Sequence, residues 1–264
     1  MKLMIRLSLI FLASCAHQNR SISTLSCKVG AQEGCQRNEV CMNNVTGPAC
    51  IAIPQIAPLQ NLVLPFDSRT EVVCTHSSGE GSHSWPNAFY ALDLANHYNK
   101  PAATVRASGD GKAFVFLGVD GKLCPKPAGS PAHAESSTCG NSWGNNIKIL
   151  HEGGYATFYV HLEKVLVKTG DFVKQGQPIG IEGWTGAAGH RHLHWSVQRI
   201  GGMTSSEWEQ HISWDGQSVP FTFQAIVKGQ KQIINSADLI CPHFDIGNGI
   251  SESQQPHLTG VLSR

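Results

Sequence analysis

Two histidines separated by one residue, His192 and His194, lie in a short stretch that alternates apolar and polar residues. Such alternation is typical of a β-strand, and side chains two residues apart on a strand project from the same face. Imidazole is the commonest metal-binding side chain, and two on one face can place one nitrogen on a metal and another beside bound water. A solvated, histidine-rich strand edge explains the pair equally well, so further ligands must come from elsewhere in the chain.

A carboxylate in an apolar setting is the next candidate. Asp93 lies between two leucines in the run 90–95, where an unpaired charge would be costly to bury. It therefore needs a cation or a set of hydrogen-bond donors, and a structural aspartate bound by backbone amides is the alternative. His83 is close enough in sequence to reach the same ion. His76 is its rival, although it follows Cys74 and belongs to the approach to the loop.

A fourth histidine, His161, ends the strand-like stretch 156–161. A lone histidine at a strand end is more often structural than catalytic. It becomes a candidate because it precedes the strand of His192 and His194 in a chain of short strands.

The elements that must position these residues are β-strands. Glycine is abundant, with 27 residues, and long amphipathic helical patterns are scarce. Frequent turn residues separate short strand-like runs, which favours an antiparallel sheet or sandwich and hence a mostly β fold. The expected strands are 113–117, 146–150, 156–161, 172–173, 178–181 and 193–197, with a last one near 219–223.

The cysteines indicate an exported, disulfide-bonded protein. Eight remain of nine when Cys15 is set aside, and an even number in an exported chain implies disulfides. The first four, Cys27, Cys35, Cys41 and Cys50, predict a small N-terminal disulfide-rich module with two internal bridges. We expect Cys124 to pair with Cys139 across a Pro/Gly/Ser/Ala-rich insertion, and Cys74 to pair with Cys241. A four-cysteine zinc site is the competing interpretation, but no Cys-x-x-Cys pair occurs.

The N-terminus is typical of an export signal. Lys2 and Arg6 precede the apolar run 7–13, which is far shorter than the roughly 20 residues of a membrane-spanning helix. Leu-Ala-Ser-Cys at 12–15 resembles a bacterial lipobox, which implies cleavage before Cys15 and lipidation of its thiol. An ordinary cleaved signal peptide is the alternative. We expect an envelope protein anchored by lipidated Cys15 on the periplasmic side, and Ala16 in place of Asp favours the outer membrane.

Several motifs follow one another in a fixed order after the His83…Asp93 pair. They are Tyr-x-His-Leu at 159–162, Val-x-x-Gly-Asp-x-Val-x-x-Gly-Gln-x-Ile-Gly at 167–180, Gly-Trp-Thr-Gly at 183–186 and His-Leu-His at 192–194. With them, residues 64–199 resemble the lysostaphin- or LytM-type peptidoglycan endopeptidases, the β-lytic zinc metallopeptidases. This resemblance implies an antiparallel β-sheet that forms a groove with a metal on its floor.

The resemblance also implies roles for five residues. His83, Asp93 and His194 would hold one Zn²⁺ per chain, and His161 and His192 would be the catalytic pair. Three protein ligands leave a fourth position for water, as in catalytic zinc sites, and zinc lowers the pKa of that water toward neutrality. Because no His-Glu-x-x-His segment supplies the usual base, we expect His161 and His192 to orient the nucleophile and stabilise the tetrahedral oxyanion.

Two departures from the family pattern stand out. Ten positions separate His83 from Asp93, where the family commonly has His-x-x-x-Asp, so His83 is the least secure ligand. The segment Gly-His-Arg-His-Leu-His adds His190 and Arg191 at the expected rim of the groove, where they could touch an anionic substrate.

The expected function is hydrolysis of peptide cross-links in bacterial peptidoglycan, with stem peptides or cross-bridges as substrates. A non-catalytic LytM-like activator of other wall hydrolases, or a wall-binding lipoprotein, is the alternative, and lost ligands would mark it. A lipoyl or biotinyl carrier shares the Val-x-x-Gly-Asp pattern but needs a lysine at a hairpin tip. The net charge of +1, with scattered Lys and Arg, argues against nucleic acid, and we expect a monomer.

The expected organisation has five parts. Residues 1–14 are the signal peptide, 15–51 the lipid-anchored cysteine-rich module, and 52–63 a linker. Residues 64–241 form the metallopeptidase domain, and 242–264 a polar C-terminal tail.

Overall fold

A computed structural model describes residues 27–28, 35, 39–43, 46–52, 61–67, 70–96, 100–118, 121–125, 139–140, 142–199, 216–227, 230–241 and 257–260. The predicted signal peptide and Cys15 lie outside these residues. Strands dominate the described chain, and its helical element is the short 3-10 helix η1 (Gly81–Ser84). None of the described helical structure is long and apolar enough to cross a membrane.

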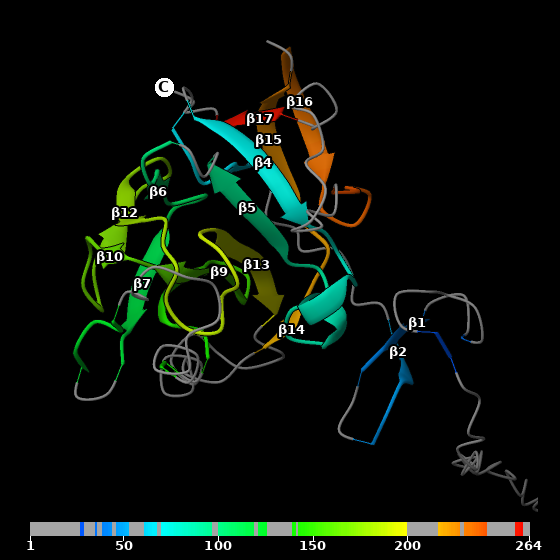
Figure 1. The fold of residues 1–264 in the computed structure, drawn as a ribbon. Helices are drawn as coiled ribbons and strands as arrows, with labels where there is room; N and C mark the ends of the chain where they lie inside the picture. Colours follow the sequence, from blue (N-terminus) through cyan, green and yellow to red (C-terminus); the bar gives the residue numbers. More distant parts are fainter. Residues whose placement is uncertain are drawn as a thin grey trace, which may run out of the picture.

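One large sheet forms the frame of the molecule (Figure 1). Its neighbouring strands are antiparallel, except for a parallel pair of β3 and β15. In spatial order it contains β11 (Phe172–Val173), β7 (Gly111–Phe116), β8 (Asn145–His151), β9 (Tyr155–Leu162), β13 (Leu193–Arg199), β5 (Leu92–Asn96), β4 (Glu71–His76), β17 (His257–Gly260), β15 (Thr222–Val227) and β16 (Gln230–Asn235), with β14 (Gln217–Ser218) on β13 and β3 (Leu62–Val63) on β15.

Two smaller sheets flank this frame. One consists of β10 (Lys164–Val165), β12 (Pro178–Ile181) and β6 (Thr104–Arg106), in that order. The other is the hairpin of β1 (Glu39–Met42) and β2 (Ala49–Ala52) near the N-terminus. Both are antiparallel.

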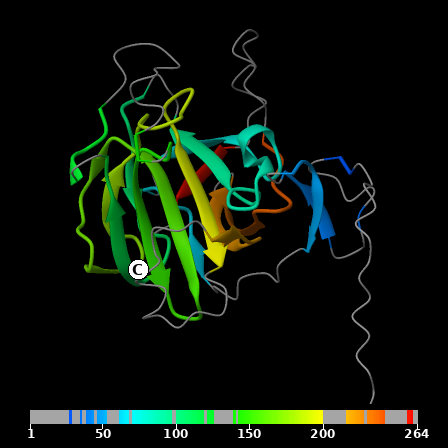
Figure 2. The ribbon, with the colours of Figure 1, turned by 90° about the horizontal axis from the view of Figure 1, so that it is seen from below.

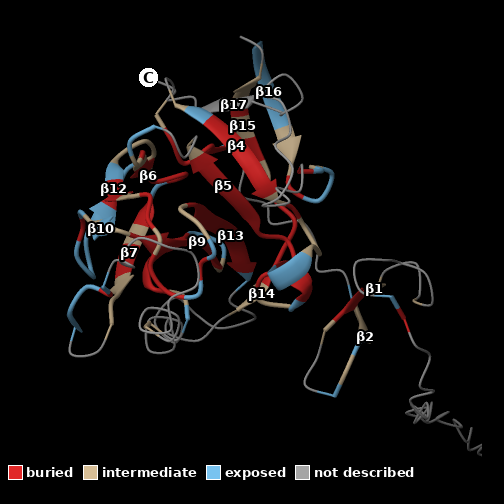
Figure 3. Ribbon diagram, viewed as in Figure 1, coloured by how far each residue is buried: buried red, intermediate tan, exposed pale blue. Residues whose placement is uncertain are grey.

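The central strands are buried on both faces, as Figure 3 shows for β5, β9 and β13. On β13, Trp195 and Val197 enter the main hydrophobic core, where the Trp195 ring meets Phe221 at 4.8 Å between centroids. The intervening residues of β13, His194 and Ser196, are equally buried but polar. Because strand side chains alternate between faces, one face of β13 packs into the hydrophobic core and the opposite face carries polar side chains, among them His194.

The predicted fold class is confirmed, since the described chain is mostly β and antiparallel, with a disulfide-linked module at its N-terminal end. The predicted bridges are confirmed as well. The module contains Cys27–Cys41 and Cys35–Cys50, and the main domain contains Cys74–Cys241 and Cys124–Cys139. Six expected strands are present as β7, β8, β9, β11, β12 and β13, and the one expected at 219–223 begins at Thr222.

Two predicted boundaries differ from the structure. The expected linker 52–63 ends in the core, because Leu62 and Val63 are buried and pair with β15. The expected tail 242–264 contains β17, whose backbone pairs with both β4 and β15. Residues 242–256 and 261–264 of that tail lie outside the described residues. Polar composition alone predicted a tail, whereas backbone hydrogen bonding in the sheet decides the position of β17.

Candidate metal centre

Asp93 and His194 are brought together by the register of two neighbouring strands. Asp93 on β5 lies directly opposite His194 on β13, so both side chains project from the same face. His194 Nδ1 lies 3.0 Å from Asp93 Oδ1. Both residues are at most 4% exposed.

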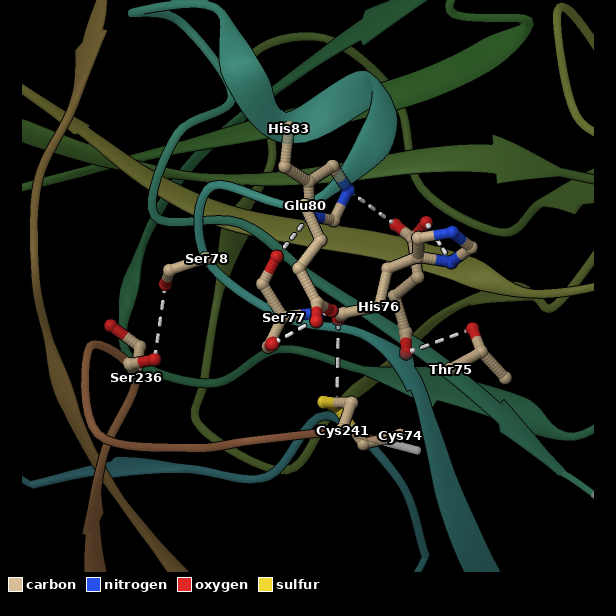
Figure 4. The surroundings of a disulfide bond; sticks show 10 residues. Cys74, Thr75, His76, Ser77, Ser78, Glu80, His83, Ser236 and Cys241 are labelled. Atoms are coloured by element: carbon tan, nitrogen blue, oxygen red, sulfur yellow. Dashed lines mark hydrogen bonds and ion pairs between the residues drawn. A yellow bond between two sulfur atoms is a disulfide. The ribbon is translucent and has the colours of Figure 1, made fainter. Parts of the chain in front are cut away.

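The third member, His83, comes from η1 rather than from the sheet (Figure 4). Its ring is fully buried, and its Nε2 lies 3.0 Å from Asp93 Oδ1 and 3.1 Å from His194 Nδ1. One donor atom from each residue therefore forms a nearly equilateral triangle. This is a group of three that could hold a metal ion.

The proton arrangement of His83 favours a cation at the centre of this triangle. His83 Nδ1 lies 3.1 Å from the Ser77 carbonyl, and since a carbonyl only accepts, Nδ1 carries the hydrogen. In the neutral ring Nε2 then presents a lone pair to a carboxylate oxygen and a second imidazole nitrogen. When the hydrogen of His194 is on Nε2, all three facing atoms are acceptors, and a cation or an added proton must lie between them.

The donor set fits zinc. Two imidazole nitrogens and one carboxylate oxygen are ordinary zinc ligands, and atoms bound to tetrahedral zinc lie about 3.3–3.6 Å apart. The observed separations of 3.0–3.1 Å are close to that spacing. Three protein ligands also leave a coordination position open, as catalytic rather than structural zinc sites do.

The rival ligand, His76, occupies a different position. It lies opposite Asp93 on β4, on the other side from His194, and its Nδ1 is 3.6 Å from Asp93 Oδ2. Figure 4 shows the His76 and His83 side chains approaching from separate segments. The geometry thus favours His83 over His76 as the ligand, with His76 beside the second carboxylate oxygen.

His161 and His192 lie next to each other at the edge of the triangle, with ring centroids 4.8 Å apart. Each ring is fixed by its Nδ1, which donates to a backbone carbonyl: His161 to Thr185 at 2.7 Å and His192 to His190 at 2.9 Å. With the hydrogen on Nδ1, Nε2 of either ring presents a lone pair whenever that ring is neutral. His192 Nε2 lies 3.6 Å from Asp93 Oδ2.

The backbone at His161 is unusual for a non-glycine residue, with φ of 67°. Such a conformation is costly and persists where the surroundings hold it. Here the His161 amide donates to the Trp143 carbonyl at 3.2 Å, and the ring is bonded to Thr185. The left-handed turn at the end of β9 thus directs the ring toward His192.

Burial and charge set different proton affinities for these groups. Burial would raise the pKa of Asp93, but His83 and His192 outweigh it and hold that pKa well below its usual value. For His83, burial lowers the pKa, yet Asp93 outweighs burial and the pKa is raised. Burial, with help from His192 and His194, lowers the pKa of His161 well below its usual value. At neutral pH the centre therefore holds an ionised carboxylate beside a neutral His161.

The Arg191 side chain is engaged by a buried carboxylate and by backbone carbonyls. Its Nε lies 3.6 Å from the buried Glu182 carboxylate, and its guanidinium donates to the Lys100 carbonyl at 2.9 Å. The expectation that it contacts an anionic substrate is therefore not supported, because these groups engage its charge. His190 lies beside the centre, with its ring centroid 4.8 Å from that of His192.

Two contributors were missed by sequence reasoning. Thr185 acts through its carbonyl, which no side-chain pattern reveals, although it belongs to the Gly-Trp-Thr-Gly motif. Trp143 packs its ring 5.3 Å from that of His194 and 5.3 Å from that of Phe158. An aromatic residue after the insertion carried no signal of its own.

Residues 89–206 match the profile of peptidase family M23. The chain is similar to the peptidoglycan DD-endopeptidase ShyC of Vibrio cholerae, with 44% identity over 75 residues, 26% of this chain and 17% of that protein. It is also similar to the cell division protein DipM of Caulobacter vibrioides (29% over 129 residues, 46% and 19%) and to lysostaphin of Staphylococcus simulans (46% over 52 residues, 19% and 10%). The matches thus span less than a fifth of each relative's length.

Among solved structures, the catalytic domain of lysostaphin from Staphylococcus simulans aligns with a TM-score of 0.34 and 22% identity, covering 52% of this chain and 85% of that one. A zinc-containing peptidase from Vibrio cholerae aligns with a TM-score of 0.36 and 18% identity, covering 78% and 51%.

Proposed function

We propose that this chain, whose residues 89–206 belong to peptidase family M23, is a zinc metalloendopeptidase that hydrolyses peptide cross-links in bacterial peptidoglycan. One observation carries the proposal. His83 Nε2, Asp93 Oδ1 and His194 Nδ1 form a buried three-atom metal site, and two further histidines stand beside it with their Nδ1 atoms tied to carbonyls. A non-catalytic relative would have no need to keep all five.

In this proposal His83, Asp93 and His194 hold the zinc ion. When bound, zinc supplies Lewis acidity, which brings the pKa of water near neutrality and polarises the scissile carbonyl. Asp93 stays ionised because its pKa is held low by His83 and His192 against the effect of burial. Its carboxylate would neutralise part of the positive charge of the ion.

His161 and His192 act on the substrate and the attacking water. His161 is neutral at pH 7, since burial lowers its pKa, so its Nε2 can accept the proton of the attacking water and return it to the leaving amine. His192 lies between His161 and Asp93. Its Nε2 lone pair can orient the attacking water, and once Nε2 carries a proton it can donate to the tetrahedral oxyanion. The carbonyls of Thr185 and His190 hold both rings in position.

The substrate class follows from the relatives and from the compartment. Three relatives from Vibrio cholerae are named peptidoglycan DD-endopeptidases, with 44–48% identity over short segments, which favours direct D-Ala cross-links over glycine bridges. Four disulfides indicate an oxidising, extracytoplasmic compartment. We further propose that the chain is monomeric and is anchored to the envelope through lipidated Cys15.

The test is mass spectrometry of purified peptidoglycan after digestion with the wild-type protein or with His194→Ala. Loss of cross-linked dimers with intact glycan strands, in the wild-type digest alone, supports the endopeptidase, and the new termini identify the bond. Loss of glycine bridges instead of D-Ala cross-links would correct the substrate. No cleavage by zinc-loaded wild-type protein would contradict the proposal and point to an activator.

A further inference from the structure

Of the three proposed zinc ligands, His83 alone is not carried by the sheet. Asp93 and His194 face each other on β5 and β13, and each strand has a second neighbour, β4 and β9, that fixes it further. His83 belongs to η1, four residues long, so contacts made by the surrounding loop decide where its ring lies. Metal affinity is sensitive to groups that orient a ligand, because a displaced ligand weakens binding.

The loop that carries His83 is held on both sides of that residue by its own side chains and by the sheet. Before His83, Glu80 accepts hydrogen bonds from the amide and hydroxyl of Ser77, which closes the turn seen in Figure 4. After it, the Ser218 amide and hydroxyl on β14 both donate to the Pro86 carbonyl. Ser84, the residue next to His83, lies between these two anchors.

Ser84 is held by the N-terminal hairpin instead. The Asn43 amide donates to the Ser84 carbonyl at 2.8 Å, and Asn43 Nδ2 donates to the Ser84 hydroxyl at 2.7 Å. Asn43 directly follows β1. In Figures 1 and 2 the hairpin lies on the side of the main domain that carries η1 and the loop after it.

An apolar contact reinforces this pair of hydrogen bonds. Met42 of β1 is fully buried and packs with Phe89 and Tyr90, which lead into β5. Ile51 of β2 packs against the same cluster. The hairpin therefore contacts the segment that joins His83 to Asp93 at both of its ends.

The disulfides explain how so small a hairpin can present Asn43 and Met42. Two four-residue strands cannot build a stable core of their own. Cys27–Cys41 ties β1, and Cys35–Cys50 ties β2, to the chain that precedes the hairpin. Cys41, beside Met42, is fully buried. The bridges thus fix the shape of the surface that meets the loop.

We propose that the disulfide hairpin is a positioning element of the metal site: by binding Ser84 through Asn43 and the 89–90 segment through Met42, it holds His83 in place for zinc. This inference rests on the proposed zinc site and extends it to the cysteine-rich module. A module that serves as a spacer between membrane and enzyme needs neither contact.

The experiment measures the zinc dissociation constant of the purified protein by competition with a chromogenic chelator. Asn43→Ala and Ser84→Ala each remove the side-chain hydrogen bond, and each should raise that constant about three- to tenfold, below the 10–100-fold typical of groups bonded directly to a ligand. Because both remove the same bond, the double variant should be no worse than either single variant. Thr46→Ala, at the exposed turn of the same hairpin, is the matched control and should bind zinc as the wild type does.

Asn43→Ala leaves the hydrogen bond from the Asn43 amide to the Ser84 carbonyl intact. A second pair of substitutions tests the contribution of that backbone contact. Cys27→Ser combined with Cys41→Ser removes the bridge that holds β1, the strand before Asn43, and should weaken zinc binding at least as much. Unchanged zinc affinity in both sets of variants would overturn the inference. A merely structural contact would lower the melting temperature of the metal-free protein and leave the zinc dissociation constant as it was.

The proposed function and this inference fail separately. A wild-type protein that binds zinc but leaves peptidoglycan intact contradicts the function, while the zinc measurements on Asn43 and Ser84 still decide the role of the hairpin. A wild-type protein that cleaves peptidoglycan, with variants that bind zinc equally well, contradicts the hairpin's role alone.

Discussion

Asp93 stands directly opposite His194 across the β5–β13 ladder, with Asp93 Oδ1 3.0 Å from His194 Nδ1. His76 stands opposite Asp93 on the other neighbouring strand. A single cross-strand row therefore places the carboxylate between two imidazoles, so two proposed ligands are set by backbone pairing alone. The third, His83, comes from a loop. The sheet therefore fixes two of the proposed ligands, and contacts of the loop fix the third.

Asp93→Asn should abolish stoichiometric zinc binding with little change in shape. The amide keeps the volume of the side chain but loses the negative charge that both His83 and His194 face at 3.0 Å. Since groups bonded behind a ligand already change metal affinity 10–100-fold, loss of a ligand should cost at least about 100-fold. Metal content by atomic emission, beside a circular dichroism spectrum to check folding, measures this.

One zinc per wild-type chain and less than a tenth of that in Asp93→Asn is the expected result. Asp110→Asn serves as the control, because Asp110 pairs with Lys174 on the surface, away from the centre. Equal zinc in Asp93→Asn and wild type would place the metal elsewhere.

His161→Asn should retain zinc and lose about 10²–10³ in rate, as removal of a group that stabilises the transition state does. Asparagine suits this position because it tolerates the positive φ that the structure records at His161. The variant separates chemistry from backbone strain, which His161→Ala would mix. Steady-state release of peptide from labelled peptidoglycan, on protein with measured zinc content, gives the rate; a rate within threefold of the wild type would remove His161 from the mechanism.

Sequence reasoning identified the site better than the frame around it. Motif spacing placed His161 and His194 on strands that exist and His192 directly before one, because alternation and turn residues are local signals. It missed β4 and β5 as strands, since Glu71–His76 and Leu92–Asn96 are mostly buried on both faces and lack alternation in burial. Positions set by long-range pairing, such as β3 and β17, leave no local trace either.

Cys124–Cys139 was predictable because it brackets the insertion, and Cys74–Cys241 because it joins the start of the main domain to its end. Within the N-terminal module the sequence predicted two bridges but not their pairing. The contact of Asn43 with Ser84 was not predictable, since it joins residues 41 positions apart through side chains that are common on any surface. For His83, too, one part was predictable from the sequence and another was not. Its residue type suggested a ligand, but the ten-residue separation from Asp93 could be resolved only by the fold of η1.

Gly183→Ala should displace both catalytic histidines. Gly183 forms an isolated bridge with His192, and a Cβ there would lie 2.4 Å from the His161 carbonyl and 2.1 Å from the Glu163 amide. The backbone beside His161 must therefore shift. We expect kcat to fall at least about tenfold, since misplacement of a catalytic group by about 1 Å can cost 10²-fold in rate. Gly189→Ala is the matched control, because nothing lies within 4 Å of its Cβ, and it should keep wild-type rate and stability. Equal kinetics for the two variants would show that the Gly183 bridge does not position the histidines.

The buried Glu182 carboxyl makes the stability of the protein depend on pH. Its fully buried carboxylate accepts hydrogen bonds from the amides of Asn96 and Ala103, which lie at the end of β5 and before β6. Burial raises its pKa to about 7 from 4.5, although the two amides and Arg191 partly oppose that shift. Between those values the folded protein binds a proton that the unfolded chain has released, so the contribution of this group to stability falls as pH rises.

The Glu182→Gln variant should therefore gain stability relative to the wild type as pH rises from 5 to 8. The carboxyl is protonated at pH 5 and charged at pH 8, and a raised pKa of this size corresponds to about 3 kcal/mol at most. Urea unfolding of the metal-free proteins at fixed ionic strength gives the free energy of unfolding of each protein. The titration of all other groups cancels in the difference between variant and wild type at each pH. Glu152→Gln, on the exposed β8–β9 turn, is the control, and its free energy of unfolding should change with pH as that of the wild type does. If Glu182→Gln does so as well, Glu182 is charged throughout that range and its pairing with Arg191 outweighs its burial.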